Sequence, residues 1–433
     1  MEERVITNLL KDVKIPKMVK VRQKFERNRI NKDDIPNVIF SQLENEKFSS
    51  LIKPGMKICI TCGSRGISNI PLIIKTIADF CKNKGALPFV IPAMGSHGGA
   101  TAQGQRDILT SLGVTEETIG CEIKSSMETV VVGHTVVGDI RPEEVEVRID
   151  KNAYEADGII LCGRIKAHTA FRGKYESGLM KMMTIGLGKQ EGAESCHKNG
   201  FKYMAHLVPE FGRIIMKNAP ILFGLAILEN SFDETCRIIA MTPDEIDKHE
   251  PELLKESFQY LPKILIDECD VLIVDEFGKN ISGEGMDPNV TGAFATEYAS
   301  GGIKAQKRAV LRLTEETHGN AHGIGLADAV SRKLFDNMDF EITYPNSITS
   351  TVLDFSKVPV VMINDKETFQ VCIKTCTEID KEKVRIVRVK NTLDLEYIYV
   401  SEGMIEDIKK NPRLEICSEP EELVFDSYGN LNI

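Results

Sequence analysis

The sequence predicts an α/β protein whose mostly parallel sheets are flanked by helices. An apolar strand-like run at 56–60, a helix-periodic segment at 71–83 and a second apolar run at 87–92 follow one another. This strand–helix–strand order is typical of a parallel sheet covered by helices. Further apolar runs at 158–163 and 272–274 each lead into a loop rich in glycine and basic residues. Because such sheets bind ligands at the carboxyl ends of their strands, we expect the functional site in these loops.

Local signals support the helices of this pattern. Pro71 stands near the start of the first helix and Gly85 lies just beyond its end. Thr101 is a suitable N-cap for a helix from Ala102 to Leu112, and Gly113 would end that helix.

A chain of 433 residues is long enough for two domains. We place the boundary after Pro262, which gives an N-terminal cofactor-binding domain over 1–265 and a C-terminal α/β domain over 266–433. The last segment is free to pack back on the N-terminal domain. A cleft between the two domains is the natural place for an active site.

Composition narrows the class of protein. The net charge of −10 argues against a nucleic-acid surface, although an acidic chain can still hold a basic pocket for a small anion. The sequence contains no run of 18 apolar residues, so we expect no membrane span. The N-terminus is charged and lacks the apolar core of a signal peptide. We therefore expect a cytoplasmic protein, with its 11 scattered cysteines present as reduced thiols.

Two spacings resemble metal sites without completing one. Cys59 and Cys62 form a C-x-x-C, but in a strand their side chains face opposite sides and no second pair accompanies them. His318 and His322 form an H-x-x-x-H among glycines that make a long helix doubtful. We favour a structural interpretation for both.

Two histidines lie in loops that follow strands. His97 stands in GSHGGAT, where flanking glycines allow close backbone approach. The alternative is a loop histidine that only hydrogen-bonds the chain. His168 stands in GRIKAHTAFRGKYESG, whose cluster of basic side chains indicates an anion such as phosphate or carboxylate. The alternative here is a solvated basic loop.

A lysine and a third histidine follow downstream. Lys181 lies in the Met-rich run SGLMKMM, where burial would lower the pKa of its amine and favour covalent chemistry. A lysine that extends from a core helix to solvent is the alternative. His197 is a candidate metal ligand or a structural histidine. Lys279, in GKNISGEGMD, lies in a loop that lacks the Walker pattern.

Taken together, the Arg65 loop, GSHGGAT, KAHTAFRG, SGLMKMM and His197 resemble the lactate racemase superfamily. The resemblance covers the N-terminal two-thirds well and extends more weakly to GKNISGEGMD. Members of this superfamily are racemases and epimerases of 2-hydroxy acids that use a nickel-pincer nucleotide. The resemblance implies the same cofactor here, and protein made without the cofactor maturation enzymes is expected to lack it.

The resemblance also implies a role for each site residue. Lys181 would bond covalently to one sulfur arm of the cofactor, and His197 would be the protein ligand of nickel. His97 and His168 would act as general acid and base on opposite faces of the substrate. Arg65 would bind the substrate carboxylate, and Lys279 would contact substrate. The residues expected to hold the cofactor phosphate surround a helix start: Gly95, Ser96, Gly98, Gly99 and Thr101.

The implied reaction inverts C2 of a 2-hydroxy acid by reversible hydride transfer. Gly98 and Gly99 after His97, and the long basic segment around His168, indicate a roomier or more polar pocket than lactate needs. We expect another small 2-hydroxy acid as substrate, maturation enzymes as partners, and no nucleic acid or membrane. A homo-oligomer is compatible with the sequence.

Two rival functions remain open. The basic loops and Lys181 would also suit an enzyme of phosphates or sugar phosphates that forms a Schiff base. A non-catalytic binder of the nickel nucleotide would need Lys181 and His197 but not the pair His97 and His168.

Overall fold

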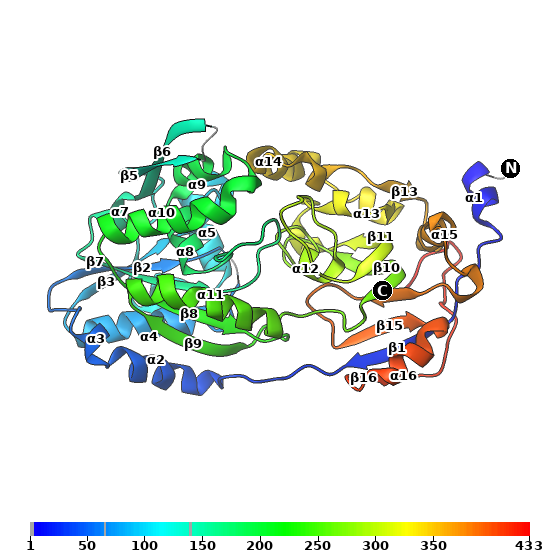
Figure 1. The fold of residues 1–433 in the computed structure, drawn as a ribbon, viewed down its shortest axis with the longest axis horizontal. Helices are drawn as coiled ribbons and strands as arrows, with labels where there is room; N and C mark the ends of the chain where they lie inside the picture. Colours follow the sequence, from blue (N-terminus) through cyan, green and yellow to red (C-terminus); the bar gives the residue numbers. More distant parts are fainter. Residues whose placement is uncertain (1–3, 65, 138–140) are drawn as a thin grey trace. The chain divides into compact units, whose positions relative to one another are not determined.

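The computed structural model describes residues 4–64, 66–137 and 141–433. The chain forms two compact units, Arg27–Leu261 and Met1–Glu26 together with Pro262–Ile433. Each unit is built on its own sheet with helices packed on it (Figure 1), which confirms the predicted α/β class.

The unit Arg27–Leu261 contains a six-stranded sheet in the order β4-β3-β2-β7-β8-β9. Neighbouring strands are parallel except β9, which pairs antiparallel with β8. The strands are β2 (Lys57–Cys62), β3 (Leu87–Pro92), β4 (Glu122–Ile123), β7 (Gly158–Arg164), β8 (Ile221–Glu229) and β9 (Thr235–Met241). The carboxyl ends of β3 and β7 lead into the loops of His97 and His168, as the sequence predicts.

Helices cover both faces of this sheet and enclose a separate apolar core on each. One core includes side chains of α2, α4 and α5, and the other includes α10, α11 and the β5–β6 hairpin. The bounds are α2 (Ile35–Leu43), α3 (Glu46–Ser49), α4 (Ile70–Asn83), α5 (Ala102–Ser111), α6 (Glu116–Ile119), β5 (Thr129–Val137), β6 (Arg141–Asp150), α7 (Lys151–Tyr154), α10 (Met204–Asn218) and α11 (Pro243–Tyr260). Cys59 lies in one core and Cys62 in the other, which confirms that they face opposite sides of β2.

The local signals act as the sequence predicts. Pro71 occupies the first turn of α4. Gly85 follows that helix at φ +79°, where an added Cβ would lie 3.2 Å from the Cβ of Pro54. The Thr101 side chain accepts a hydrogen bond of 3.0 Å from the Gly104 amide and so caps α5.

The second unit contains an eight-stranded sheet in the order β13-β12-β11-β10-β14-β15-β1-β16. The five strands from β13 to β14 are parallel, and the remaining pairs are antiparallel. The strands are β1 (Met18–Gln23), β10 (Glu268–Phe277), β11 (Lys304–Leu313), β12 (Ala329–Ser331), β13 (Val360–Met362), β14 (Ile386–Val389), β15 (Tyr397–Ser401) and β16 (Leu414–Ile416). The helices are α1 (Val5–Leu10), α12 (Pro288–Thr291), α13 (Arg332–Phe335), α14 (Phe340–Ser350), α15 (Asp365–Thr375) and α16 (Ile405–Lys410).

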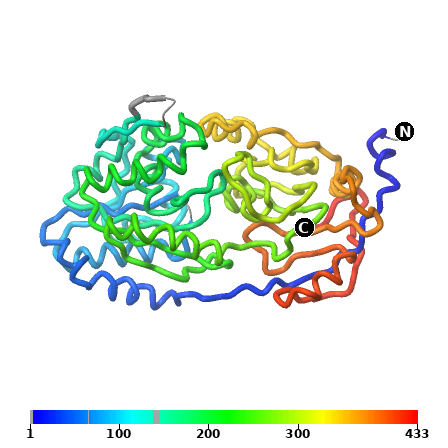
Figure 2. Tube along the Cα trace, viewed as in Figure 1, coloured from blue at the N-terminus to red at the C-terminus, as the bar shows by residue number. Residues whose placement is uncertain are grey.

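The N-terminal segment corrects the domain boundary expected from sequence. Residues 1–26 cluster with the C-terminal unit instead of belonging to a domain over 1–265. The reason is sheet pairing, because β1 lies between β15 and β16 (Figure 2), with Met18 opposite Ser401 and Val21 opposite Ile416. Periodicity along the chain does not reveal a partner strand so far away in sequence.

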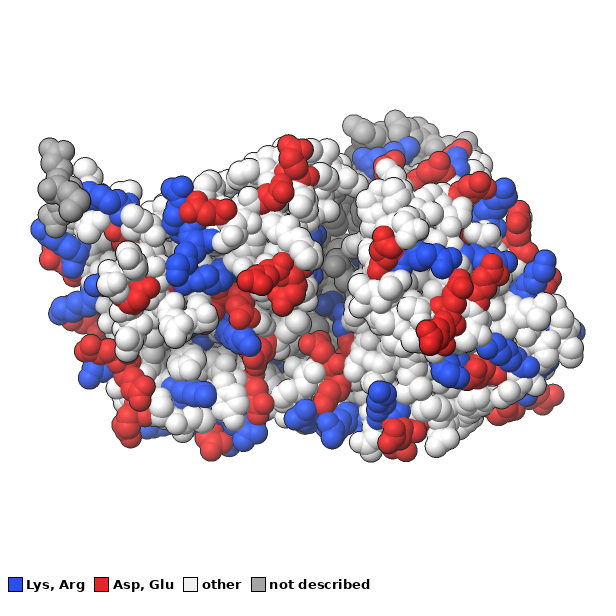
Figure 3. Space-filling model, turned by 180° about the vertical axis from the view of Figure 1, so that it is seen from behind, with Lys and Arg blue, Asp and Glu red and all other residues white. Residues whose placement is uncertain are grey.

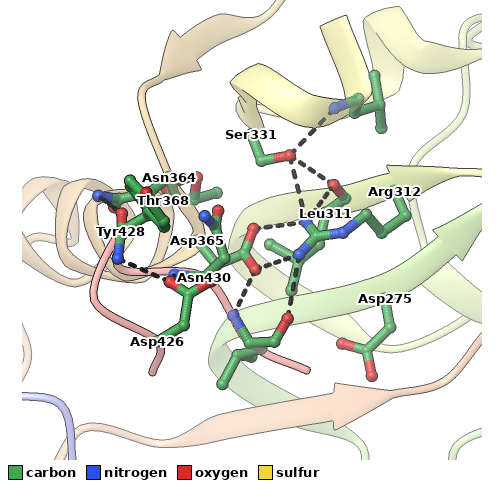
Figure 4. Close-up of polar contacts among 12 residues, drawn as sticks. Asp275, Leu311, Arg312, Ser331, Asn364, Asp365, Thr368, Asp426, Tyr428 and Asn430 are labelled. Carbon is green, nitrogen blue, oxygen red and sulfur yellow. Dashed lines mark hydrogen bonds and ion pairs between the residues drawn. The ribbon is translucent and has the colours of Figure 1, made fainter. Parts of the chain in front are cut away.

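The C-terminal segment belongs to the unit formed by residues 1–26 and 262–433. The guanidinium of Arg312 pairs with both carboxylate oxygens of Asp365 at 2.6 and 2.5 Å (Figure 4). The Leu431 amide donates to Asp365 at 2.8 Å, and the Leu431 carbonyl accepts from Arg312 at 3.3 Å. This buried ion pair therefore fixes the end of the chain at the carboxyl end of β11.

The surface shows mixed charge. On the face in Figure 3, Lys and Arg side chains are interspersed with Asp and Glu. In the described part of the chain, the helices are too short or too polar to cross a lipid bilayer.

Candidate active site

The loop of His168 is shaped by one buried carboxylate. Oε2 of Glu176 accepts a hydrogen bond of 2.7 Å from the His168 amide, and Oε1 accepts one of 3.2 Å from the Gly173 amide. Arg172 adds an ion pair to Glu176 at 3.4 Å and donates to the His168 carbonyl at 2.5 Å. The loop after β7 is thus folded around Glu176, and part of its basic character is neutralised there.

The ring of His168 contacts the amine of Lys181. Nε2 of His168 lies 2.5 Å from Nζ of Lys181, and the Ala170 amide donates to Nδ1 at 3.0 Å. Because Nδ1 accepts, the hydrogen-bond network assigns the proton of a neutral ring to Nε2. The two nitrogens are thus within hydrogen-bond distance, and the positive charge of Lys181 acts directly on the ring of His168.

Lys181 lies on a short, irregular helical segment. Helix α8 (Leu179–Lys181) continues into a π-helical turn, Met182–Gly186. Such π turns often occur at functional sites. The carboxylate of Glu250 on α11 accepts hydrogen bonds from the amides of Leu179 at 3.0 Å and Met180 at 3.1 Å. It therefore caps the helix that presents Lys181, and complete burial raises the pKa of Glu250 to about 8.

Gly178 permits this cap. A Cβ added at Gly178 would lie 2.2 Å from Oε1 of Glu250, so a larger residue would displace the carboxylate. The glycine is needed for close approach, because its own backbone is extended.

His197 completes the group at the end of α9 (Lys189–His197). Burial, and then the charge of Lys181, lower its pKa to about 4. Burial also lowers the pKa of His168 well below its usual value, followed by the charges of Lys181 and His197. The Phe201 ring lies 5.9 Å from the ring of His197 and 6.5 Å from that of His168. The structure thus brings His168, Lys181 and His197 together as one basic cluster.

The His97 loop contacts this segment through its backbone. The Gly95 amide donates to the Gly186 carbonyl at 3.3 Å, and a Cβ on Gly186 would lie 2.7 Å from the Ala93 carbonyl oxygen. His97 itself is exposed. The loop of the fourth predicted site residue therefore lies against the turn that follows Lys181.

The predicted phosphate loop precedes α5. Thr101 already caps the Gly104 amide, and Gly98 packs so closely on Gly104 that an added Cβ would lie 2.4 Å from its carbonyl carbon. Gly98 is therefore required by packing, which corrects its interpretation as a sign of a roomy pocket. Gly99 has open space beside it. That this loop, with Ser96, holds a phosphate stays a prediction.

The structure does not test the roles predicted for the remaining residues. Arg65 lies outside the described residues. Lys279 lies in the other unit, where its amine donates to the Gly283 carbonyl at 2.9 Å. His322 is buried, with Nδ1 3.1 Å from the Ser347 hydroxyl, as the structural interpretation predicts. The substrate-binding roles of Arg65 and Lys279 stay predictions.

Sequence reasoning missed the residues that support the site. Glu176, Glu250, Asp150 and Lys189 are buried charged side chains. Lys, Asp and Glu side chains are almost never fully buried unless they are paired, so a sequence alone gives no reason to expect these four in the interior. The one hint in the sequence is Gly178, since a glycine directly before the Lys181 helix can indicate the close approach of another side chain.

The candidate metal-binding side chains of this site fit a metal that is held mainly by its own cofactor. Among the residues that the structure describes, no three His, Cys, Asp or Glu side chains gather as a metal site. A nickel-pincer nucleotide would supply sulfur and carbon ligands itself, so one neutral imidazole is enough from the protein. His197, which is half-buried and whose pKa is lowered to about 4, is such an imidazole.

Comparison with known proteins identifies the N-terminal part of the chain. Residues 4–206 match the family model of the lactate racemase N-terminal domain, a span that includes His97, His168, Lys181 and His197. This match confirms the resemblance predicted from the motifs. Residues 4–206 are therefore similar to the N-terminal domain of lactate racemase.

A solved structure is also similar. It is the lactate racemase apoprotein from Thermoanaerobacterium thermosaccharolyticum, with a TM-score of 0.41 and 15% sequence identity, over 67% of this chain and 68% of that chain. No curated protein sequence matches the chain.

Proposed function

We propose that this protein is a cytoplasmic racemase or epimerase that inverts C2 of a 2-hydroxy acid other than lactate. The single observation that carries the proposal is the contact between Lys181 and His168 beside His197, in a segment of lactate racemase type. A nickel-pincer nucleotide, when bound, would supply a reversible hydride acceptor.

The residues of the cluster would divide the work. Lys181 would attach the nucleotide covalently through its amine. His197 would offer a neutral ring nitrogen to nickel. His168 would then exchange its contact with Lys181 for one with the substrate hydroxyl. To accept the hydroxyl proton at Nε2, the ring would carry its own proton on Nδ1, which requires release of the Nδ1 contact with the Ala170 amide.

Lowered histidine pKa values suit these roles. A histidine whose pKa lies below neutrality is unprotonated at pH 7, so it is ready to bind a metal or accept a proton. The cluster is partly buried, which strengthens the electrostatic contacts within it relative to those at an open surface. His97 is the candidate acid or base for the opposite face of the substrate.

The surroundings of His168 favour an anionic substrate. Lys166 and Arg172 both lower the pKa of His168, so their positive charges act at this ring. A carboxylate bound there would meet a positive field.

Intact-protein mass after co-expression with cofactor maturation enzymes and nickel tests the proposal. Wild type is expected to gain the mass of the nucleotide, Lys181→Ala is expected to gain none, and the exposed control Lys202→Ala is expected to behave as wild type. Loaded enzyme would then be screened for racemisation of 2-hydroxy acids. If wild type gains no mass while the same system loads a known relative, the proposal is wrong.

The partly buried amine of Lys181 also fits a second function. An enzyme of sugar phosphates could use it to form a Schiff base, and borohydride reduction with substrate would then trap an adduct at Lys181. A non-catalytic nickel-nucleotide binder differs again, because it would load the cofactor normally and lack any activity that depends on His97 and His168.

A further inference from the structure

A fully buried ion pair lies behind the candidate site. Nζ of Lys189, the first residue of α9, lies 3.1 Å from Oδ2 of Asp150 at the end of β6, and neither side chain is exposed. Lys189 adopts φ +53°, a conformation that lysine rarely takes. The backbone is therefore held in an uncommon geometry that directs this amine inward.

The same amine continues into a chain of hydrogen bonds that ends at His97. Nζ of Lys189 donates to Oε1 of Gln105 at 3.0 Å and to the Pro92 carbonyl at 2.5 Å. The amide nitrogen of Gln105 then donates to the carbonyls of Gly95 at 2.8 Å and His97 at 3.3 Å. Gln105 is itself fully buried.

Glutamine is the side chain that this place requires. It accepts from the lysine amine through its oxygen and donates to two carbonyls through its nitrogen. A carboxylate would accept from Lys189 but would turn an oxygen toward the carbonyls. A methionine of similar size would make neither bond.

The other end of the chain belongs to the segment of Lys181 and His197. Helix α9, which begins at Lys189, ends at His197. The Asp150 amide donates at 2.7 Å to the carbonyl of Leu187, which directly follows the turn after Lys181. One buried network thus connects the His97 loop to the segment of Lys181 and His197.

We propose that Asp150, Lys189 and Gln105 form a positioning relay that sets where His97 stands relative to Lys181 and His197. The relay acts through the backbone of the His97 loop and touches neither substrate nor cofactor. Its kinetic consequence rests on the proposed function, whereas its effect on the loop does not.

The structural test compares two identical substitutions on α5. Gln105→Met removes both bonds to the loop, and Gln103→Met changes an exposed glutamine two positions away. Amide hydrogen exchange over 95–101 and the ring ¹⁵N shifts of His97 are measured in the protein without cofactor. Gln105→Met is expected to speed exchange by about tenfold or more and to shift His97, because an opened loop loses its protection. Gln103→Met is expected to match wild type.

The kinetic test uses cofactor-loaded enzyme. Gln105→Met is expected to load cofactor normally, to lose about 10²-fold in kcat and to change KM little, since a misplaced catalytic group costs rate more than binding. If Gln105→Met fails to fold, Gln105→Glu, which keeps an acceptor for Lys189, takes its place.

The outcomes separate the relay from the proposed function. Unchanged exchange and unchanged His97 shifts in Gln105→Met would overturn the relay, whatever the enzyme does. A kcat loss that merely follows a loss of bound cofactor would overturn it as well. If wild type does not load cofactor at all, the proposed function fails, and the exchange and shift measurements still decide the relay.

Discussion

Polar clusters in the two units differ in how their charges are balanced. The cluster of the second unit, which we call the paired cluster, consists of Asp275, Arg312, Asp365 and Arg388. Arg312 faces Asp365 at 2.5 Å and Arg388 faces Asp275 at 2.8 Å, so each positive charge has its own carboxylate. The paired cluster joins β10, β11, β14 and α15 and holds the C-terminal segment.

The basic cluster of His168, Lys181 and His197 is arranged in the opposite way. The charged groups that act most strongly on His168 are Lys181, His197 and Arg172, and all of them lower its pKa. The carboxylates nearby, Glu176 and Glu250, bind backbone amides of the same segments. Matched charges are used to hold elements together, whereas gathered like charges keep histidines neutral and ready for chemistry.

The largest expected effect comes from breaking the paired cluster. Asp365→Ala leaves the guanidinium of Arg312 mostly buried without its carboxylate and also removes the acceptor of the Leu431 amide. We expect a loss of about 3–5 kcal/mol in the free energy of unfolding, measured by urea titration. The control Asp354→Ala removes an exposed ion pair with Lys357 and should cost about 1 kcal/mol or less. Equal losses of unfolding free energy in the two variants would show that the paired cluster does not stabilise the fold.

A pH-dependent effect is expected next, at Glu250. Since its folded pKa of about 8 lies above the usual 4.5, the folded state keeps a proton that the unfolded state releases between these values. Stability from this group is therefore greatest at low pH and falls as the pH rises toward 8. Glu250→Gln keeps an acceptor for the two amides and lacks this titration, so its unfolding free energy should gain on the order of 2–3 kcal/mol relative to wild type between pH 5.5 and 8.

The matched control for this prediction lies on the same helix. Glu252→Gln changes a carboxylate that is 75% exposed. Its unfolding free energy should follow that of wild type across the pH range. A Glu250→Gln variant with the pH dependence of wild type would contradict the raised pKa of Glu250.

The smallest expected effect concerns the basic cluster itself. Lys181→Met removes the charge that, after burial, most lowers the pKa of His168. The pKa of His168 should therefore rise in the variant, which ring ¹⁵N shifts followed against pH would detect in protein without cofactor. The exposed control Lys202→Met should leave it unchanged. A pKa of His168 that stays in place would show that the two side chains do not interact in solution.

The sequence predicted the elements whose signals are local. Pro71, Gly85 and Thr101 mark helix ends through backbone geometry and capping, and the structure confirms all three. The assignment of residues 1–26 to the N-terminal domain was wrong, because strand pairing joins β1 to β15 and β16 over most of the chain length.

For the candidate site, the sequence supplied the residues but not their arrangement. His168 and Lys181 are named by their motifs, and the family match covers both. Neither their 2.5 Å contact nor the support from Glu250 follows from those motifs. Sequence spacing alone does not show which side chains burial will bring together.

The sequence by itself thus determined the fold class, the strand-end loops and the chemical groups available in them, since these depend on local pattern and residue type. The tertiary structure alone decided which charges are paired and which gather with like charges. The physical reason is that burial makes the energy of a charged group depend on its neighbours in space. In this protein, those neighbours include Glu250 for the Lys181 helix and Lys189 for the His97 loop.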